Sequence, residues 1–522
     1  MAENFGFAMF NERFVEHANK IIASWQNLKN NKDEYESKIK FELGEENKYW
    51  CATCGKEAEK ETDQQLVENP VNECNNEPPL ASYRIPIIGH TWRYLKDCET
   101  LILESREKYG ETFSLYIFGQ VMTIVGKETT HEVLKKDQEF CFREGTEMQL
   151  PMDHILSNVP DFTRNAKIIK EFAIGKLKYL MSRLQKNIDK AIDLYIGDCD
   201  EPKIIHDASK TVADIIAIPI TNIIVGEEDY MHEDLLETFK NITSSVIKAL
   251  VVPPILAFIH PWLHKQFVTI PLRFGWNPIT KHRKIIINRI KPIIEKRLYD
   301  KKNLGDAWIA PVDALQCYLD DPEITPDLDP NNVNYDHIVD ALGDFVFAAM
   351  GTTINGATRS LYELVERKQY WQELYEEAQE INKQCNGNEL TTDDIAKMVK
   401  LDSFVKEALR FSKGRMVMLN FIDTHYDEGL QGQNPKEFYA YRHMERSPAT
   451  KIDRNFLGFG GGKHACPGRS LAVNEIKVFL HKILLKYNAR TEIENNEPQR
   501  NHVGPLANFL KGGMVFENRK EI

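Results

Sequence analysis

The residues with the clearest chemical potential lie in one window of the sequence, from Phe456 to Tyr487. Cys466 and Pro467 stand there directly before an apolar helical stripe, and a first-turn proline can open a helix because it loses no hydrogen bond. The dipole and the free backbone N–H groups at a helix N-terminus favour a thiolate over a thiol. We therefore expect Cys466 to act as a sulfur ligand for a metal. The stripe that defines the helix consists of Leu471, Ile476, Phe479, Leu480, Ile483 and Leu484.

Three glycines, Gly460 to Gly462, precede this cysteine. Because glycine has no side chain, they would let the backbone approach a large flat group closely, and a porphyrin is such a group. A phosphate-binding loop is the competing interpretation of Gly462 and Lys463. That motif would require glycine at Leu457 and serine or threonine at His464, so it fails at two positions.

A second pair of residues suggests an internal ion pair. Glu407 and Arg410 lie three apart in KLDSFVKEALRF, where the apolar spacing predicts a helix, so their side chains can meet. Most such pairs are ordinary surface salt bridges, and the pair alone is therefore weak evidence. Its position 56 residues before Cys466 gives it more weight.

A third element runs from Asp340 to Glu366 and is typical of a long buried helix. The small residues Ala348, Ala349 and Gly351 would leave a shallow patch beside Thr352 and Thr353. Threonine hydroxyls in helices often bond the carbonyl group one turn back, so a purely structural role for the pair is the alternative.

The order of Phe459, Gly462, Cys466 and Gly468 matches the pattern FxxGxxxCxG, and with the two preceding elements it resembles the cytochrome P450 family. The resemblance covers most of residues 81–522 and has the character of fungal microsomal members, some of them sterol-modifying. It implies a haem held by the thiolate of Cys466, between an oxygen-binding helix and the cysteine loop. Phe459 falls where an aromatic ring packs beside the sulfur.

The resemblance implies roles for the remaining candidate residues. His464 falls where the family places a basic partner for a haem propionate. Glu407 and Arg410 would form the buried pair that braces the cysteine loop. Thr352, followed by Thr353, takes the place of the alcohol that hydrogen-bonds dioxygen at the iron.

The sequence departs from the family pattern in three places. Gly351 replaces the usual acid before the threonine pair, and Asp344, two turns away, would have to act through water. The segment between Arg410 and Asn434 is shorter than the strands that usually line the pocket, and it lacks the expected arginine around Asn420. The early W-x-x-x-R signature is missing, which leaves Arg164 as a weak candidate for its arginine.

The surrounding sequence predicts the elements that must position these groups. We expect an α+β chain, mainly α with small β-sheets, as in the cytochrome P450 fold. Two β-rich runs, 112–118 and 120–126, meet at Gly119 and predict a hairpin, whereas helical periodicity dominates from Phe162 onward. The basic run from Lys281 to Arg297 carries isoleucines at helical spacing, which predicts one solvated face of an amphipathic helix.

Two further predictions concern the ends of domains and the membrane. Residues 1–80 are expected to form an extension, with an amphipathic helix at 8–30 and an acidic linker at 56–79, before a catalytic domain at 81–522. The first residues lack the order of a signal peptide, and no run reaches the roughly 20 apolar residues of a spanning helix. The apolar segment 249–263 is broken by three prolines, so it is either a loop that dips into lipid or a buried turn.

Net charge and cysteine content indicate which classes of function and which compartment suit the chain. The 66 basic and 78 acidic side chains give a net charge of −12, which argues against a general nucleic-acid surface. Nine cysteines without framework spacing indicate a reducing compartment. Cys51 and Cys54 form half of a zinc pattern for which only Cys74 and His17 are nearby partners, so we expect no metal there.

The resemblance implies a haem-thiolate monooxygenase that inserts one oxygen atom from O2 into an apolar small molecule such as a sterol, fatty acid or terpenoid. Electrons would come from NADPH through cytochrome P450 reductase, with cytochrome b5 as a further donor, at the cytosolic face of the endoplasmic reticulum. Two rivals stay open. The replacement of the acid by Gly351 would suit a haem-thiolate isomerase or dehydratase, and the shortened segment would suit a non-catalytic haem or lipid binder.

Overall fold

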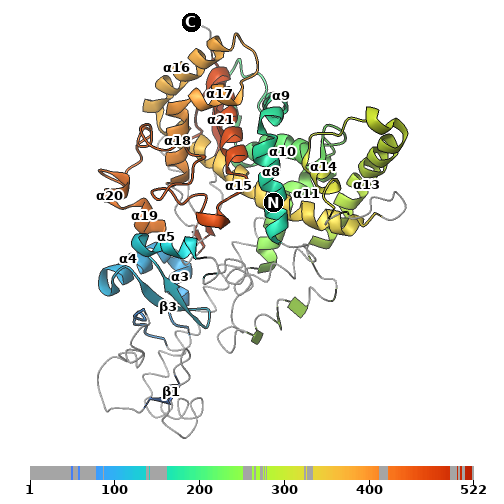
Figure 1. Cartoon of the computed structure of the whole chain (residues 1–522). Helices are drawn as coiled ribbons and strands as arrows, with labels where there is room; N and C mark the ends of the chain where they lie inside the picture. The colour runs from blue at the N-terminus through green and yellow to red at the C-terminus, as the bar shows by residue number, and fades with distance from the viewer. Residues whose placement is uncertain are drawn as a thin grey trace.

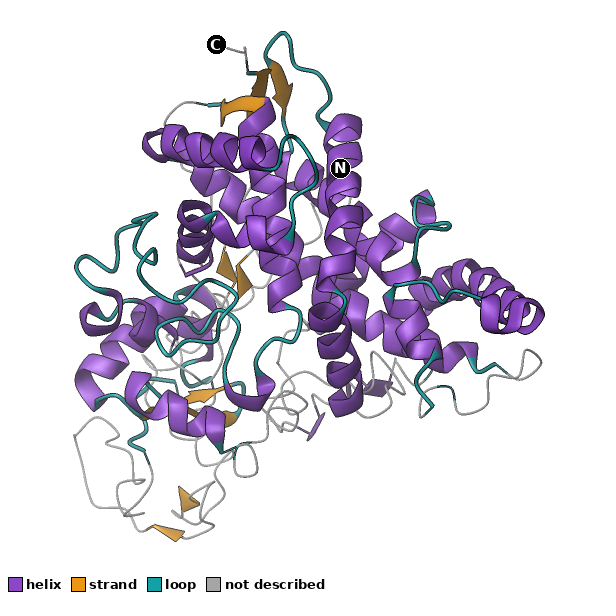
Figure 2. Ribbon diagram, turned by 45° about the horizontal axis from the view of Figure 1, so that its top comes forward, coloured by secondary structure: helices purple, strands orange, loops and turns teal. Residues whose placement is uncertain are grey.

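The computed structural model describes residues 78–85, 88–136, 162–250, 279–322, 333–410, 421–493 and 512–519, together with a few shorter pieces. These residues form a helical body with a smaller lobe that carries a β-hairpin at one side (Figures 1 and 2). The predicted fold class, mainly helical with small antiparallel sheets, is confirmed.

The helical body begins with α8 at Phe162, where helical periodicity was expected to take over. The predicted basic amphipathic helix is confirmed as α13, because most of its isoleucines are buried while the lysines of the basic run are exposed. The helices of the body are α8 (Phe162–Gly175), α9 (Leu177–Tyr195), α10 (Ala208–Val225), α11 (Glu233–Leu250), α13 (Ile279–Leu304), α14 (Ala314–Leu319), α15 (Tyr335–Glu366), α16 (Lys368–Gln384), α17 (Thr392–Lys397), α18 (Val399–Arg410) and α21 (Arg469–Lys486).

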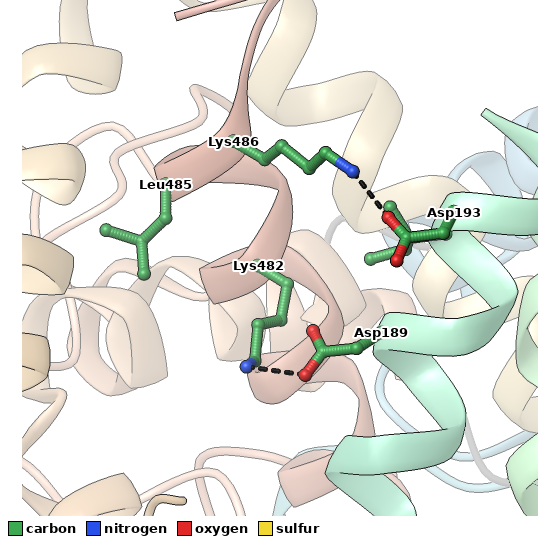
Figure 3. Close-up of a pocket in the computed structure, with 6 residues that line it drawn as sticks. Asp189, Asp193, Lys482, Leu485 and Lys486 are labelled. Carbon is green, nitrogen blue, oxygen red and sulfur yellow. Dashed lines mark hydrogen bonds and ion pairs between the residues drawn. The ribbon is translucent and has the colours of Figure 1, made fainter. Parts of the chain in front are cut away.

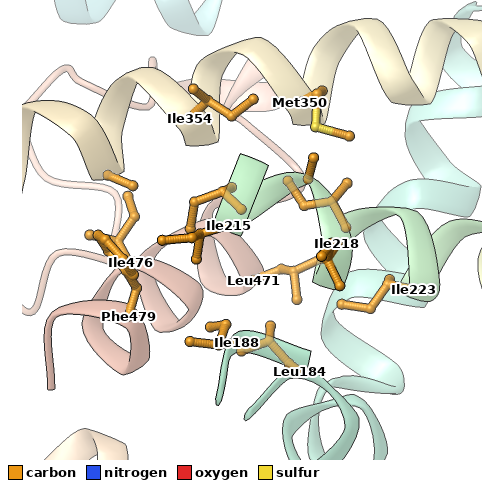
Figure 4. Close-up of a cluster of buried hydrophobic side chains, with 14 of the residues drawn as sticks. Leu184, Ile188, Ile215, Ile218, Ile223, Met350, Ile354, Leu471, Ile476 and Phe479 are labelled. Carbon is orange, nitrogen blue, oxygen red and sulfur yellow. The ribbon is translucent and has the colours of Figure 1, made fainter. Parts of the chain in front are cut away.

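Helix α15 is the element around which the body is packed. It contacts α8, α10, α11, α13, α14, α18 and α21. Figure 4 shows Met350 and Ile354 of α15 above Ile215 of α10 and Ile476 of α21 in one apolar core. All six apolar residues predicted for the helix after Cys466 are buried in α21. Because a fully buried aliphatic side chain contributes about 1.5–3 kcal/mol relative to exposure, this core fixes the helices that carry the motifs.

The smaller lobe contains the predicted hairpin. Strand β3 (Phe113–Ile117) pairs with β4 (Gln120–Ile124) in antiparallel register, with Ile117 opposite Gln120. The two turn residues, Phe118 and Gly119, have φ of 52° and 77°, as a tight turn with two left-handed positions requires. Helices α3 (Thr91–Lys96), α4 (Cys98–Tyr109) and α5 (Lys127–Lys135) complete this lobe, which has its own apolar core.

The remaining elements are short. Strands β5 (Lys203–Ile205), β9 (Met514–Asn518) and β6 (Tyr487–Thr491) form a three-stranded antiparallel sheet in that order. Two pairs of two-residue strands are β1 (Tyr49–Trp50) with β2 (Glu57–Ala58), and β7 (His502–Val503) with β8 (Leu506–Ala507). The short helical pieces are η3 (Gly305–Ala307), α19 (Phe421–His425), α20 (Glu428–Gln431) and η4 (Gly462–His464).

Several predictions fall on residues outside the described part: the helix at 8–30, most of the linker at 56–79, both cysteines of the CxxC pair and residues 251–261. By length and composition, α10 and α15 are apolar enough to cross a membrane, but about 72% and 67% of their apolar windows are buried among other helices. They are core helices here. The five described cysteines, Cys98, Cys199, Cys317, Cys385 and Cys466, form no disulfide bond with one another.

Candidate functional site

The cysteine loop, residues 456–468, leads into α21 and is closed by a backbone hydrogen bond. The backbone N–H of Cys466 donates to the carbonyl oxygen of Phe459 at 2.8 Å, and the thiol is partly exposed. The first residue of α21 is Arg469, two positions beyond the proline expected to open the helix. The Arg469 guanidinium donates to the carbonyl oxygens of Cys466 and Thr450, both at 2.8 Å. The first residue of α21 therefore binds the backbone of the loop and of the segment before it.

Protein packing explains two of the three glycines before the cysteine. A Cβ atom on Gly462, whose φ is +60°, would lie 2.1 Å from the carbonyl oxygen of Leu134 at the end of α5. A Cβ on Gly461 would lie 2.9 Å from Cδ1 of the same leucine. The expectation that all three glycines admit a flat group is therefore too broad, because Gly461 and Gly462 admit α5. Gly460 also has a left-handed φ of +67° but meets nothing closer than 3.6 Å.

The other predicted residues of the loop are Phe459, His464 and Gly468. Phe459 packs edge-on against Phe456, with ring centroids 6.0 Å apart. His464 lies in η4 and is exposed. Gly468 precedes α21, and a Cβ there would meet no atom within 4 Å in the described part of the chain. Open space therefore borders the loop next to Cys466, on the side of Gly468.

The predicted Glu407–Arg410 pair exists and is completely buried. The arginine Nη2 and Nε atoms lie 2.7 and 2.8 Å from the two carboxylate oxygens, in a bidentate arrangement. Arg410 also donates to the carbonyl oxygens of His425 and Pro435. The pair therefore joins α18 to the chain segment that leads towards the cysteine loop.

Two residues that the sequence patterns did not mark complete this buried cluster. Arg442 donates from Nε to Glu407 at 3.1 Å, and His443 Nε2 lies 3.0 Å from the other carboxylate oxygen. Burial alone would raise the pKa of Glu407, but hydrogen bonds from Arg410 and His443 outweigh it and hold this pKa well below its usual range. The available signal was an adjacent arginine and histidine in a segment otherwise rich in aromatic residues.

On α15 the two predicted threonines lie on different sides of the helix. Thr352 is exposed, as is Ala348 one turn before it, whereas Thr353 is 5% exposed. The Thr352 hydroxyl donates to the carbonyl oxygen of Ala348 at 2.7 Å, the bond expected from the structural alternative. With its proton engaged in this way, the hydroxyl oxygen can still accept a hydrogen bond. Ala348 and Thr352 are thus exposed together, one turn apart, in the middle of a helix that is otherwise mostly buried. A flat group can lie against this exposed part of α15.

The position where the family carries an acid is filled from another helix. A Cβ on Gly351 would lie 2.8 Å from Cγ2 of Thr243 on α11. The Thr243 hydroxyl donates to the carbonyl oxygen of Phe347 at 3.3 Å. Asp344, the alternative acid, is held in the core by a 2.7 Å hydrogen bond from Asn165. Burial raises the pKa of Asp344 to about 6.

The helices that carry the three motifs, α15, α18 and α21, contact one another at Gly356. A Cβ on Gly356 of α15 would lie 2.9 Å from Ile476 of α21 and 3.4 Å from Leu409 of α18. Gly356 follows Thr352 by one turn, Leu409 lies between the members of the buried pair, and Ile476 follows Cys466 in α21. Residues far apart in the sequence thus converge on a single packing point.

These observations fit a haem-like group: a partly exposed sulfur at the start of a helix, open space beside it and an accessible face on α15. The predicted site residues that fall outside the described side chains are Arg164 and the stretch 411–420 with Asn420. One pocket in the described part of the chain lies away from these motifs, between α9 and α21. There Lys482 and Lys486 pair with Asp189 and Asp193 at 2.9 and 2.5 Å (Figure 3). These surface ion pairs offer no chemistry related to the motifs.

Comparison with known proteins agrees with this arrangement. The family model described as cytochrome P450 matches residues 78–413 and 411–510, and its two segments meet just after Arg410. Cytochrome P450 monooxygenase 110 of Postia placenta is 24% identical over 473 residues, which cover 81% of this chain and 89% of that protein. A cholesterol 16,22-dihydroxylase of Trigonella foenum-graecum is 24% identical over 486 residues, which cover 85% and 92% of the two chains.

Proposed function

The chain belongs to the cytochrome P450 family of haem-thiolate enzymes, and from this premise we propose that it inserts one oxygen atom from O2 into an apolar small molecule. We propose that Cys466 provides the thiolate, because it lies in the loop that leads into α21, is partly exposed, and has its backbone N–H fixed by the carbonyl oxygen of Phe459. The haem, when bound, supplies the activation of dioxygen. The residues of the chain hold it, orient it and manage protons around it.

We assign the other predicted site residues by their geometry. Thr352 would accept or pass a proton at its hydroxyl oxygen, because that oxygen lies on the accessible face of α15. Glu407 and Arg410 would hold the fold behind the cysteine loop. His464 would face a propionate from the exposed turn η4, and Gly468 would leave room beside the sulfur.

The substrate is proposed to be apolar, of the sterol, fatty-acid or terpenoid kind. The exposed part of α15 offers Ala348 and a single hydroxyl, a surface with few polar groups to pair. The name of the Trigonella relative, a cholesterol dihydroxylase, supports a sterol-like ligand among these classes.

Electrons are proposed to come from NADPH through cytochrome P450 reductase, with cytochrome b5 as a second donor. We also propose peripheral contact with the cytosolic face of the endoplasmic reticulum. The support is a set of exposed apolar side chains between α11 and α13, in and after the proline-broken segment. These are Trp262, Phe267, Ile270 and Phe274, the last of which is 81% exposed. Residues 81–522 are proposed as the catalytic domain and residues 1–80 as an extension.

The test is the spectrum of the ferrous carbon-monoxide complex. We expect the purified wild-type protein to show the red-shifted Soret band of a thiolate-bound haem and the Cys466→Ala variant to lose it. Cys385→Ala, which removes another free and partly exposed thiol, is the matched control and should keep the band. A band that survives in Cys466→Ala would refute the ligand assignment.

A second candidate function follows from the glycine at position 351. Without an acid at this position, a haem-thiolate isomerase or dehydratase, which needs no external electrons, is the alternative. Oxygenated product that forms only with NADPH and reductase supports the monooxygenase. Turnover that is independent of both would support the isomerase.

A further inference from the structure

A five-residue helix, α19, lies between the buried ion pair and the cysteine loop. Its last residue, His425, receives a hydrogen bond at its carbonyl oxygen from Arg410. Its ring nitrogen Nε2 accepts the backbone N–H of Leu457 at 3.2 Å. Both the main chain and the side chain of one residue are therefore engaged, on one side by α18 and on the other by the cysteine loop.

The same histidine ring stacks on the loop. The rings of His425 and Phe456 are nearly parallel, at 14°, with centroids 6.0 Å apart. The Lys406 ammonium lies 5.3 Å from the centroid of the Phe456 ring, so α18 contacts this ring as well. Phe456 is 1% exposed and packs edge-on against Phe459, whose carbonyl oxygen accepts the N–H of Cys466. A continuous series of contacts thus runs from α18 to the cysteine.

Helix α19 is anchored on a second side. Asp423 pairs with Arg106 of α4 at 2.5 Å and accepts the N–H of Lys127 at the start of α5 at 2.9 Å. At its other end, α5 presents Leu134 to Gly462 of the cysteine loop. The contacts therefore close a ring, in which α19 touches the loop directly through His425 and indirectly through α5.

We propose that His425 is a positioning residue for the thiolate, which it sets by accepting the Leu457 N–H and by stacking on Phe456. This proposal rests on the proposed function, because it concerns the same cysteine. An imidazole can accept at Nε2 only when it is neutral with its proton on Nδ1. Burial lowers the pKa of His425 to about 3, with Arg410 acting in the same direction, so the ring is neutral at ordinary pH.

Three variants separate the two contacts. His425→Phe keeps a ring for stacking but leaves the Leu457 N–H as a buried donor without its acceptor. His425→Gln keeps a side-chain acceptor without the ring, and Phe456→Leu removes the stacking while the hydrogen bond stays. The matched control is His481→Phe, since His481 in α21 is also buried and forms no hydrogen bond to the loop or to α19 in the described part of the chain.

The measurement is the ratio of the red-shifted to the unshifted Soret band in the ferrous carbon-monoxide complex of the full-length holoprotein, with haem content measured separately. We expect His425→Phe to lower this ratio roughly tenfold, the size of effect that an unpaired buried donor produces, while His425→Gln retains more of it. Phe456→Leu should lower the ratio, and His481→Phe should leave it unchanged. If His425→Phe cannot be purified, the same ratio is compared among the other variants. Lower ratios in His425→Gln and Phe456→Leu than in His481→Phe support the proposal, and equal ratios contradict it.

The proposal is overturned if His425→Phe and Phe456→Leu keep the wild-type ratio, or if His481→Phe lowers it equally. Failure of the proposed function would look different. In that case the wild-type protein itself would show no red-shifted band, or Cys466→Ala would retain it.

Discussion

Thr243 of α11 occupies the space that a Cβ atom at Gly351 of α15 would need. The absence of an acid at position 351 is therefore coupled to the position of a neighbouring helix. A side chain there would require Thr243 to shift. The departure from the family pattern is a packing arrangement between two helices.

The first prediction tests this coupling. We expect Gly351→Ala to lower the free energy of unfolding by about 1–2 kcal/mol, because the new methyl group overpacks the contact with Thr243. Thr243→Ala in the same chain should recover most of that loss, which gives a coupling energy of about 1 kcal/mol in a double-mutant cycle. Gly343→Ala lies in the same helix, and its new Cβ would meet no atom within 4 Å in the described part of the chain, so it should instead stabilise the protein by up to about 1 kcal/mol. Equal effects at both glycines would contradict the contact.

The second prediction concerns Arg442, which sequence patterns did not mark. Arg442→Ala leaves the buried Glu407 with one charged partner fewer, so we expect a loss of about 3–5 kcal/mol in stability. Arg93→Ala breaks an exposed pair with Glu104 and should cost less than about 1 kcal/mol. Denaturant unfolding of both variants provides the measurement, and a small loss for Arg442→Ala would mean that Glu407 is satisfied without it.

The third prediction separates the two threonines. Thr352→Ala should lower product formed per NADPH consumed by about 100-fold, since it removes the accessible hydroxyl proposed to manage protons. Thr353→Ala should leave this ratio close to wild type and lower stability instead, because Thr353 is buried. Product and NADPH are measured together. The opposite ranking would assign the role to Thr353.

The fourth prediction is a pH dependence of stability. Burial raises the pKa of Asp344 to about 6, above its unfolded value of 3.8, so the folded state binds the proton more tightly. Its contribution is therefore fully present below pH 3.8 and is lost as pH rises to about 6. Asp344→Asn keeps an oxygen for Asn165 but cannot ionise. Its free energy of unfolding relative to wild type should therefore increase by about 1–3 kcal/mol as the pH is raised from 4 to 7. The exposed Asp306→Asn should show no such gain in urea unfolding at the two pH values.

The fifth prediction ranks the glycines of the loop. Gly462→Ala should displace the loop and remove the red-shifted carbon-monoxide band, because its Cβ would meet the Leu134 carbonyl oxygen at 2.1 Å. Gly460→Ala has room, so it should cost only the roughly 1–2 kcal/mol of a left-handed backbone and keep the band. Spectra and thermal unfolding of the two variants test the ranking. A reversed order would mean that α5 does not press on the loop.

The sequence alone determined what local chemistry and periodicity control. A proline, a cysteine and an apolar stripe predicted the helix after Cys466, although its first residue proved to be Arg469. Two β-rich runs that meet at Gly119 predicted the hairpin, and the three-residue spacing of Glu407 and Arg410 predicted their pair. These features need only neighbouring residues, so they can be recognised in a single chain.

Tertiary structure decided which partners the local motifs meet. Three contacts join residues that no spacing rule relates. They are Thr243 against Gly351, Leu134 against Gly462, and Arg442 and His443 on Glu407. The same holds for His425, whose ring binds the cysteine loop from a short helix of unremarkable sequence. Packing in three dimensions brings such residues together, because burial satisfies hydrogen bonds and fills space wherever the folded helices happen to meet.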